Sequence, residues 1–195
     1  DIGCGIGQGV EYLLKSGKYV GVEVDHPTVM KAKEIHPSAD FVEADAAKLP
    51  FRDRSIPVII ALEIIEHLRF EDALHFIHEI RRILKPNGKL FLSTPDGRPS
   101  LVKKLVGSYS ATSHVREYTP GEIKKMFTSA GFELLEERTL PIVQFPCGII
   151  GATLLQIVAE YPKFYPTIAI FTRILGYRTK LFVWQLKDET FSISP

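Results

Sequence analysis

The sequence opens on a loop in which glycine occupies every second position, and no other stretch constrains the fold as strongly. Residues 3, 5, 7 and 9 are glycine and follow the acidic Asp1. Glycine adopts backbone conformations that a Cβ forbids, and it lets a ligand approach the main chain closely where a strand turns into a helix. The spacing therefore predicts a cofactor-binding turn, with a helix that begins near Gln8.

The spacing excludes two other kinds of glycine loop. The dinucleotide-binding pattern G-x-G-x-x-G would place its third glycine at position 8, where the chain has glutamine. A P-loop continues into Gly-Lys-Ser or Gly-Lys-Thr, which the sequence does not contain. The loop instead resembles motif I of the class I S-adenosylmethionine (SAM)-dependent methyltransferases, D/E-x-G-x-G-x-G. Asp1, Gly3, Gly5 and Gly7 match this motif in full, and the resemblance implies that the three glycines receive the methionine part of SAM.

Length and composition favour a single domain over residues 1–195. The chain has 195 residues, of which 45% are hydrophobic, enough for one well-buried core. Its net charge of +1 argues against a nucleic-acid partner. The two cysteines, Cys4 and Cys147, suggest no disulfide framework and fit a reducing compartment, so we expect a cytoplasmic protein. Because the chain begins inside the motif, we expect the strand before the glycine loop to be truncated.

The second predicted strand carries a candidate ribose ligand. Residues 19–24 read as a short buried strand, and Glu23 lies twenty positions after Gly3. Open α/β nucleotide folds place a carboxylate at about this distance to accept the ribose hydroxyls. We therefore assign Glu23, with the adjacent Val24, to the ribose, in preference to a solvated acid at a strand end. Asp25 is expected to cap the helix that starts at Pro27.

Two later strands complete the predicted cofactor site. Residues 39–44 form the third strand, and the resemblance implies that Asp45 and the small Ala46 bind the adenine. An aspartate in a polar loop is otherwise only a turn residue. Residues 56–62 are almost wholly apolar, as in a central strand buried on both faces. The resemblance implies that Leu62 and Glu63, at the end of this strand, line the SAM pocket.

The segment that begins at Glu63 resembles the "E-x-x-E-H-L" element of the family. On one helical turn Glu63, Glu66 and His67 would share a face, where they could hold a divalent cation such as Mg²⁺ or position a general base. With His114 they resemble the metal site of small-RNA 2′-O-methyltransferases and of ubiquinone-biosynthesis O-methyltransferases. Other relatives carry the segment without a metal, and His67 then only orients the loop near the sulfonium. His67 is the candidate catalytic residue.

The remaining pattern completes a Rossmann-like, doubly wound sheet of seven strands. It predicts an amphipathic helix over residues 72–84, a strand at 89–95, a helix capped by Thr119, and strands at 132–137 and 181–186. The segments 84–95 and 119–132 again resemble the family. Basic residues on the acceptor side could meet an anionic substrate or be scattered surface charge: Arg98, Lys103, Lys104, Arg116 and Arg178.

An apolar insert at residues 141–179 departs from a minimal methyltransferase. Neither of its apolar pieces reaches the roughly 20 residues that span a bilayer, so a hairpin of two short helices is expected. The insert could be a lid or a dimer interface, or a surface that touches the membrane or holds a lipid-like acceptor.

These patterns predict a SAM-dependent methyltransferase of the type 11/23 kind that acts on a small-molecule or lipid-like acceptor. Two alternatives remain open. One is an RNA 2′-O-methyltransferase with a divalent metal site, which the near-zero net charge opposes. The other is a non-catalytic module that binds SAM or another nucleotide.

Overall fold

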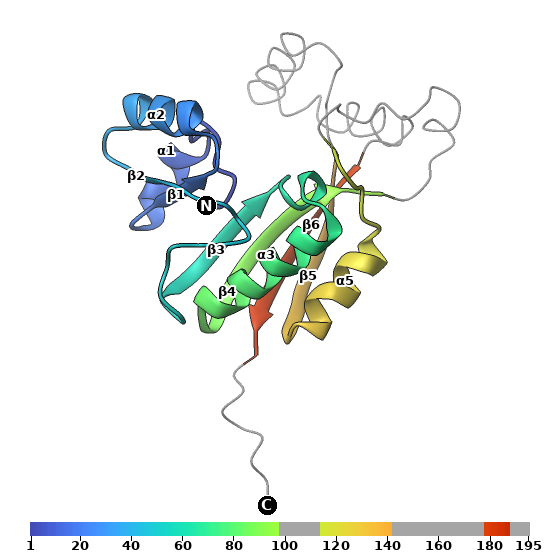
Figure 1. Cartoon of the computed structure of the whole chain (residues 1–195). Coiled ribbons are helices and arrows are strands. Elements are labelled where there is room, and N and C mark those ends of the chain that lie inside the picture. The colour runs from blue at the N-terminus through green and yellow to red at the C-terminus, as the bar shows by residue number, and fades with distance from the viewer. Residues whose placement is uncertain (98–113, 142–177, 188–195) are drawn as a thin grey trace, which may run out of the picture.

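The computed structural model describes residues 1–97, 114–141 and 178–187, which form an α/β fold (Figure 1). The helices are α1 (Val10–Leu13), α2 (His26–Ile35), α3 (Phe70–Ile83) and α5 (Pro120–Ser129), with 3-10 turns η1 (Leu14–Ser16) and η2 (Ile65–His67). The strands are β1 (Val20–Glu23), β2 (Asp40–Glu43), β3 (Ile56–Leu62), β4 (Leu84–Pro95), β5 (Phe132–Pro141) and β6 (Arg178–Leu186). Every predicted helix and strand that falls within these ranges is confirmed. The predicted insert lies, apart from its ends, outside the described residues.

Ile2 joins the two parts of the sheet. β1 pairs with β2, and the other strands follow the order β3-β4-β6-β5. Ile2 forms parallel bridges to Val22 of β1 and to Ala61 of β3, which gives the overall order β2-β1-Ile2-β3-β4-β6-β5. β6 runs antiparallel to both of its neighbours. β1 and β2, which follow Ile2 in the chain, lie on one side of it, and the later strands lie on the other side. The strand order therefore reverses at Ile2, and doubly wound sheets bind ligands at such a switch point.

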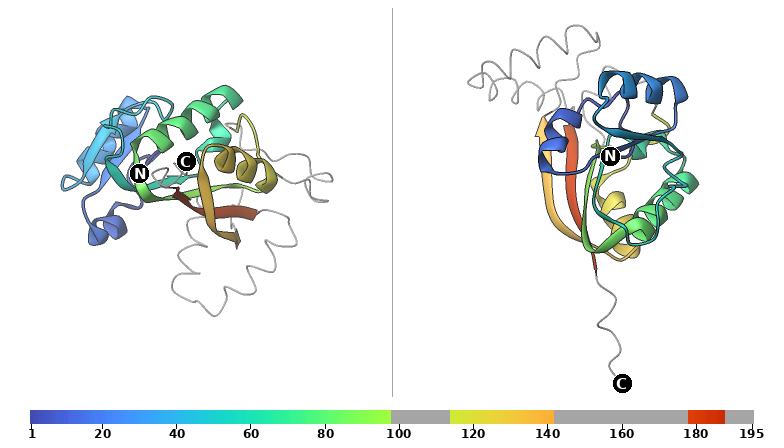
Figure 2. Two further views of the ribbon diagram at one scale, coloured as in Figure 1. Left: turned by 90° about the horizontal axis from the view of Figure 1, so that it is seen from below. Right: turned by 90° about the vertical axis from the view of Figure 1, so that its left-hand side faces the viewer.

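Two hydrophobic clusters cover the sheet. In the larger one, α3 and α5 pack on the sheet, and the ring of Phe127 stacks on that of Trp184 at a centroid distance of 5.1 Å. The smaller cluster joins α1 and α2 to the start of β1 and to Phe41 of β2. Gly21 lies against Phe41, whereas the next residue, Val22, belongs to the larger cluster. Successive strand residues point to opposite faces, so helices cover both sides of the sheet, as Figure 2 shows.

The start of β3 differs from the sequence-based expectation. The prediction of a strand buried on both faces is wrong here, because Pro57 is exposed and the side chain of Val58 is 49% exposed. Beside this part of β3 lies a groove of about 500 Å³ that separates it from β1. The pairing of β3 with β4 is irregular between Ile56 and Val58 and becomes regular only beyond Pro57, as expected for a proline at the start of a strand, which provides no backbone donor. Within the described ranges, no helix is long and apolar enough to cross a bilayer.

Candidate functional site

The glycine loop forms a cradle at the switch point of the sheet. Gly3, Gly5 and Gly7 all have positive φ angles, of 72°, 54° and 82°. A Cβ on Gly3 would lie 2.9 Å from the side chain of Ile64, and one on Gly7 would lie 2.9 Å from that of Val10, so these two glycines are required by packing. A Cβ on Gly5 would meet no heavy atom within 4 Å. Gly5 therefore borders open space, where a ligand can approach the backbone.

The Glu23 side chain lies against this loop. Its Oε2 accepts a hydrogen bond from the backbone N–H of Gly5 at 3.1 Å. Its Oε1 accepts from the N–H groups of Val24 and Asp25 at 2.8 and 3.2 Å. A carboxylate oxygen can accept two hydrogen bonds, so Oε2 retains capacity for a ribose hydroxyl. The side chain of Val24 is exposed at the same edge of the sheet.

The end of β2 lies beside Glu23. The backbone N–H of Ala44 donates to the carbonyl of Glu23 at 3.0 Å. The Asp45 side chain is exposed, and its Oδ1 closes a turn by accepting from the N–H of Ala47 at 2.8 Å. The side chain of Ala46 is buried in the larger core. Asp45 thus stands at the predicted edge and also fulfils the ordinary role of a turn residue.

Asp1 anchors the start of the glycine loop. Its Oδ2 accepts a hydrogen bond from the hydroxyl of Tyr19 at 2.8 Å. Tyr19 is buried, and its ring packs edge-on against Phe41. Burial raises the pKa of Tyr19, which keeps its hydroxyl protonated as a donor. The contact fixes the carboxylate where the glycine loop begins.

Glu63, at the end of β3, has an unusual backbone conformation. Its φ of 53° lies in the left-handed region, which is strained for a residue with a Cβ. Two contacts with Ser93 of β4 hold it there. The Ser93 hydroxyl donates to Oε1 of Glu63 at 2.6 Å, and the Glu63 N–H donates to the Ser93 carbonyl at 3.0 Å. The preceding Leu62 is 47% exposed and lies at the rim of the candidate site.

A second polar cluster lies next to Glu63. One potential ligand atom each from Glu66, His67 and His114 lies within 4.8 Å of the other two. The rings of His67 and His114 meet edge-on, with centroids 4.9 Å apart. Glu63 is not part of this group, and the prediction that it shares a helical turn with Glu66 and His67 is wrong. The left-handed backbone at Glu63 interrupts the turn, which comprises only residues 65–67.

Glu66 is fully buried and incompletely paired. Its Oε2 accepts a hydrogen bond from the hydroxyl of Thr94 at 3.1 Å, whereas Oε1 has no hydrogen-bond partner among the described residues. Burial, reinforced by the nearby carboxylate of Glu63, raises the pKa of Glu66 to about 8. Nδ1 of His114 is also buried without a hydrogen bond in this part of the chain, and it lies 3.8 Å from Oε1 of Glu117. Buried polar atoms without partners are costly and are concentrated at ligand sites.

Sequence reasoning missed Ser93 and Thr94, which hold the two glutamates. They are consecutive residues at the carboxyl end of β4, and they contact the two acids that follow β3, Glu63 and Glu66. Two adjacent hydroxyl residues after an apolar strand are the available sequence signal. Their partners could not be chosen without the register of β3 and β4.

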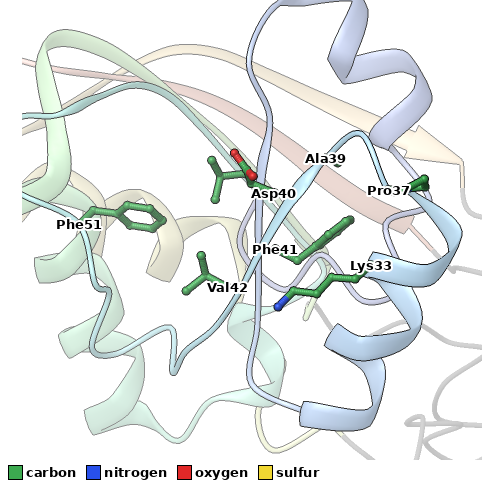
Figure 3. A pocket seen from close by; sticks show the side chains of 8 residues that line it. Lys33, Pro37, Ala39, Asp40, Phe41, Val42 and Phe51 are labelled. Carbon is green, nitrogen blue, oxygen red and sulfur yellow. The ribbon is translucent and has the colours of Figure 1, made fainter.

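The pocket in Figure 3 lies away from these residues. It has a volume of about 520 Å³. It is lined by Asp40, Phe41 and Val42 of β2, with Phe51 and Lys33 among the other lining residues. Its charged lining residues are Lys33 and Asp40, and it includes none of the predicted site residues. We assign it no role in the candidate site.

Comparison with known proteins agrees with the fold and the loop. Residues 1–92 match the Methyltransf_11 family, described as a methyltransferase domain. A probable SAM-dependent methyltransferase of Mycolicibacterium smegmatis is 29% identical over 141 residues, which cover 69% of this chain and 51% of that protein. A phthiotriol/phenolphthiotriol dimycocerosates methyltransferase of Mycobacterium ulcerans is 32% identical over 105 residues, which cover 51% of this chain and 37% of that protein. The chain thus spans about half or less of the length of these relatives.

Solved structures share the architecture. A SAM-dependent methyltransferase from Methanosarcina mazei superposes with a TM-score of 0.72 at 17% identity, covering 97% of this chain and 92% of that one. The [4+2]-cyclase SpnF gives a TM-score of 0.71 at 20% identity, covering 96% of this chain and 74% of that one. The fold is that of the class I SAM-dependent methyltransferases, and the glycine loop agrees with it. The first half of the chain is similar to the Methyltransf_11 family.

Proposed function

We propose that this chain binds SAM at the glycine loop and transfers its methyl group to a small-molecule or lipid-like acceptor. The observation that carries the proposal is the open space beside Gly5, next to the Glu23 carboxylate, at the switch point of the sheet. The methionine part would lie on Gly3, Gly5 and Gly7, with Asp1 fixing the loop. The other parts of SAM would contact the ribose residues Glu23 and Val24, the adenine residues Asp45 and Ala46, and Leu62 and Glu63 at the pocket wall.

Bound SAM supplies a methyl group activated by its sulfonium. The chain then needs to align an acceptor with that methyl group, and proximity accounts for much of the rate in such reactions. The exposed His67 is the candidate base for an acceptor oxygen or nitrogen, because histidine is the side chain that most often serves as a general base. No covalent intermediate with the protein is required.

A lipid-like acceptor is supported by two observations. The relative from Mycobacterium ulcerans is named for phthiotriol and phenolphthiotriol dimycocerosates. In this chain, three apolar side chains near the polar cluster are exposed by 46% to 57%: Leu62, Phe70 and Val115. The net charge of +1 gives no support to an RNA substrate. A lid, dimer or membrane role for residues 141–179, and the cytoplasmic location, stay predictions.

SAM binding is tested by calorimetry on the folded protein, with S-adenosylhomocysteine as a second ligand and NADH as a control. Glu23→Ala is expected to weaken SAM binding about 10-fold to 100-fold, since a hydrogen bond to a charged group contributes about 1.5–3 kcal/mol. Glu43→Ala is the matched control, because Glu43 ends the neighbouring strand β2 and pairs with His26 instead. Absence of saturable SAM binding would refute the proposal and favour the non-catalytic module.

The polar cluster supports a second candidate function, a divalent cation that assists an oxygen acceptor. Glu66, His67 and His114 offer one carboxylate and two imidazoles, and Glu66 and His114 each contain a buried atom without a hydrogen bond in the described chain. This donor set suits Mn²⁺, Co²⁺ or Zn²⁺ better than Mg²⁺, which prefers oxygen ligands. A cation there would lower the pKa of an acceptor hydroxyl and favour its alkoxide.

Cobalt titration followed by visible absorption tests this cation site. Wild-type protein is expected to bind one Co²⁺, and His114→Ala is expected to bind it about 10-fold to 100-fold more weakly, because one of three ligands is lost. His78→Ala is the control, since His78 is exposed on α3 and does not belong to the cluster. Equal cobalt affinity in wild type and His114→Ala would exclude this site.

A further inference from the structure

Arg116 lies beside the polar cluster, and its guanidinium contacts three side chains. Its guanidinium carbon is 5.1 Å from the ring centroid of Phe70 and 5.0 Å from that of Tyr118. Its Nη2 donates to Oε1 of Glu122 at 2.8 Å. The sequence suggested that Arg116 could meet an anionic substrate; in the structure these three contacts hold its guanidinium in place, and the side chain is 43% exposed.

The same segment is fastened to the cluster through its backbone. The N–H groups of Val115 and Arg116 both donate to the carbonyl of Glu66, at 2.9 and 3.0 Å. The Arg116 side chain then connects this segment to Phe70, where α3 begins, and to Glu122 in the first turn of α5. α3 and α5 lie on the same side of the sheet (Figures 1 and 2), so Arg116 links the two helices at their amino ends.

Glu122 is itself fixed. Its Oε2 accepts from the backbone N–H and the hydroxyl of Thr119, both at 2.8 Å, in a complete capping box. Hydrogen bonds from Thr119 and then from Arg116 lower the pKa of Glu122, so it remains charged at neutral pH. Arg116 is thus held by the capped Glu122 and by two aromatic rings whose centroids lie about 5 Å from its guanidinium carbon.

We infer that Arg116 is a positioning residue that holds His114 against His67 and Glu66. His114 precedes Arg116 by two residues, and its Nδ1 forms no hydrogen bond among the described residues that would orient the ring. Besides its contacts with the His67 ring and, at 3.8 Å, with Oε1 of Glu117, the position of the ring depends on the backbone that Arg116 and Glu66 fix. The inference rests on the proposed function only in treating this cluster as the acceptor side of the site. A planar guanidinium can stack on two rings while it donates to a carboxylate, which a lysine ammonium cannot reproduce.

The test is a direct measurement of the contact between the two histidine rings. In the full chain with labelled histidines, the wild type is expected to show a nuclear Overhauser cross-peak between the ring protons of His67 and His114, whose centroids are 4.9 Å apart. Arg116→Ala is expected to lose this cross-peak, and Arg116→Lys to recover part of it by keeping the ion pair. Arg138→Ala is the control, because Arg138 pairs with Glu136 on β5.

Binding measurements separate this inference from the proposed function. Arg116→Ala is expected to leave SAM affinity within about twofold and to weaken Co²⁺ binding about 10-fold to 100-fold, as loss of a supporting residue around a metal site does. If the wild type binds neither SAM nor Co²⁺, the proposed function is refuted. The cross-peak between His67 and His114 then still tests whether Arg116 positions His114. Phe70→Leu removes one ring of the stack and serves if Arg116→Ala does not fold. An unchanged cross-peak in the folded variant overturns the inference.

Discussion

Gly5→Leu is expected to weaken SAM binding by about 100-fold or more, equivalent to about 2.8 kcal/mol, while the protein still folds. The new side chain would enter the open space beside the glycine loop, where a Cβ meets no heavy atom within 4 Å. The positive φ of 54° adds a strain of about 1–2 kcal/mol, which appears in the free energy of unfolding rather than in binding. Calorimetric titration with SAM and thermal denaturation measure the two effects separately.

A matched variant isolates the steric effect from the backbone strain. Gly131 also has a positive φ, of 87°, and a Cβ there would come no closer than 3.6 Å to its neighbours. Gly131→Leu is therefore expected to lose a similar amount of stability and to bind SAM as the wild type does. Wild-type SAM affinity in Gly5→Leu would show that the cofactor does not lie on this loop.

The metal-free protein is expected to lose stability as the pH rises from about 4.5 to about 8, and Glu66→Gln is expected to abolish this loss. Burial and then the Glu63 carboxylate raise the pKa of Glu66 from 4.5 in the unfolded chain to about 8 in the folded one. Between these values the unfolded state binds fewer protons, so the free energy of unfolding falls as the pH increases. The decrease is expected to be of the order of 5 kcal/mol, and denaturant unfolding in the presence of a chelator measures it.

Glu79→Gln provides a control of opposite sign. Hydrogen bonds from Arg82 lower the pKa of Glu79, so its contribution is present above pH 4.5 and is lost as the pH falls below that value. This variant should change the acid side of the profile and retain the slope between pH 5 and 8. If Glu66→Gln retains that slope too, another group causes it.

Local sequence signals predicted the parts of the structure that depend on neighbouring residues. Asp25 caps α2 by accepting from the N–H of Thr28 at 3.0 Å, and Thr119 and Glu122 form the expected capping box. The position of Glu23 relative to the glycine loop also follows from the sequence, because one helix and one strand separate them and together fix the number of intervening residues.

The acceptor side could not be predicted from spacing, because distant segments determine it. Glu63 is fixed by Ser93, thirty positions later, and the resulting left-handed backbone breaks the helical turn that the E-x-x-E pattern suggests. Arg116 stacks on Phe70, which only the docking of α3 beside the 114–118 segment brings within reach. A motif can nominate His67 and His114, but the side chains that orient them come from other elements.

The buried aromatic stack has a spectroscopic consequence. Trp184 is the only tryptophan in the sequence; it is fully buried and stacks with the rings of Phe127 and Phe182. Its emission therefore reports solvent entry beneath α5 without interference from a second indole. The glycine loop and the smaller hydrophobic cluster contain no tryptophan. An unfolding transition that changes Trp184 emission without releasing the ligand would therefore show that the larger cluster opens independently of the glycine loop.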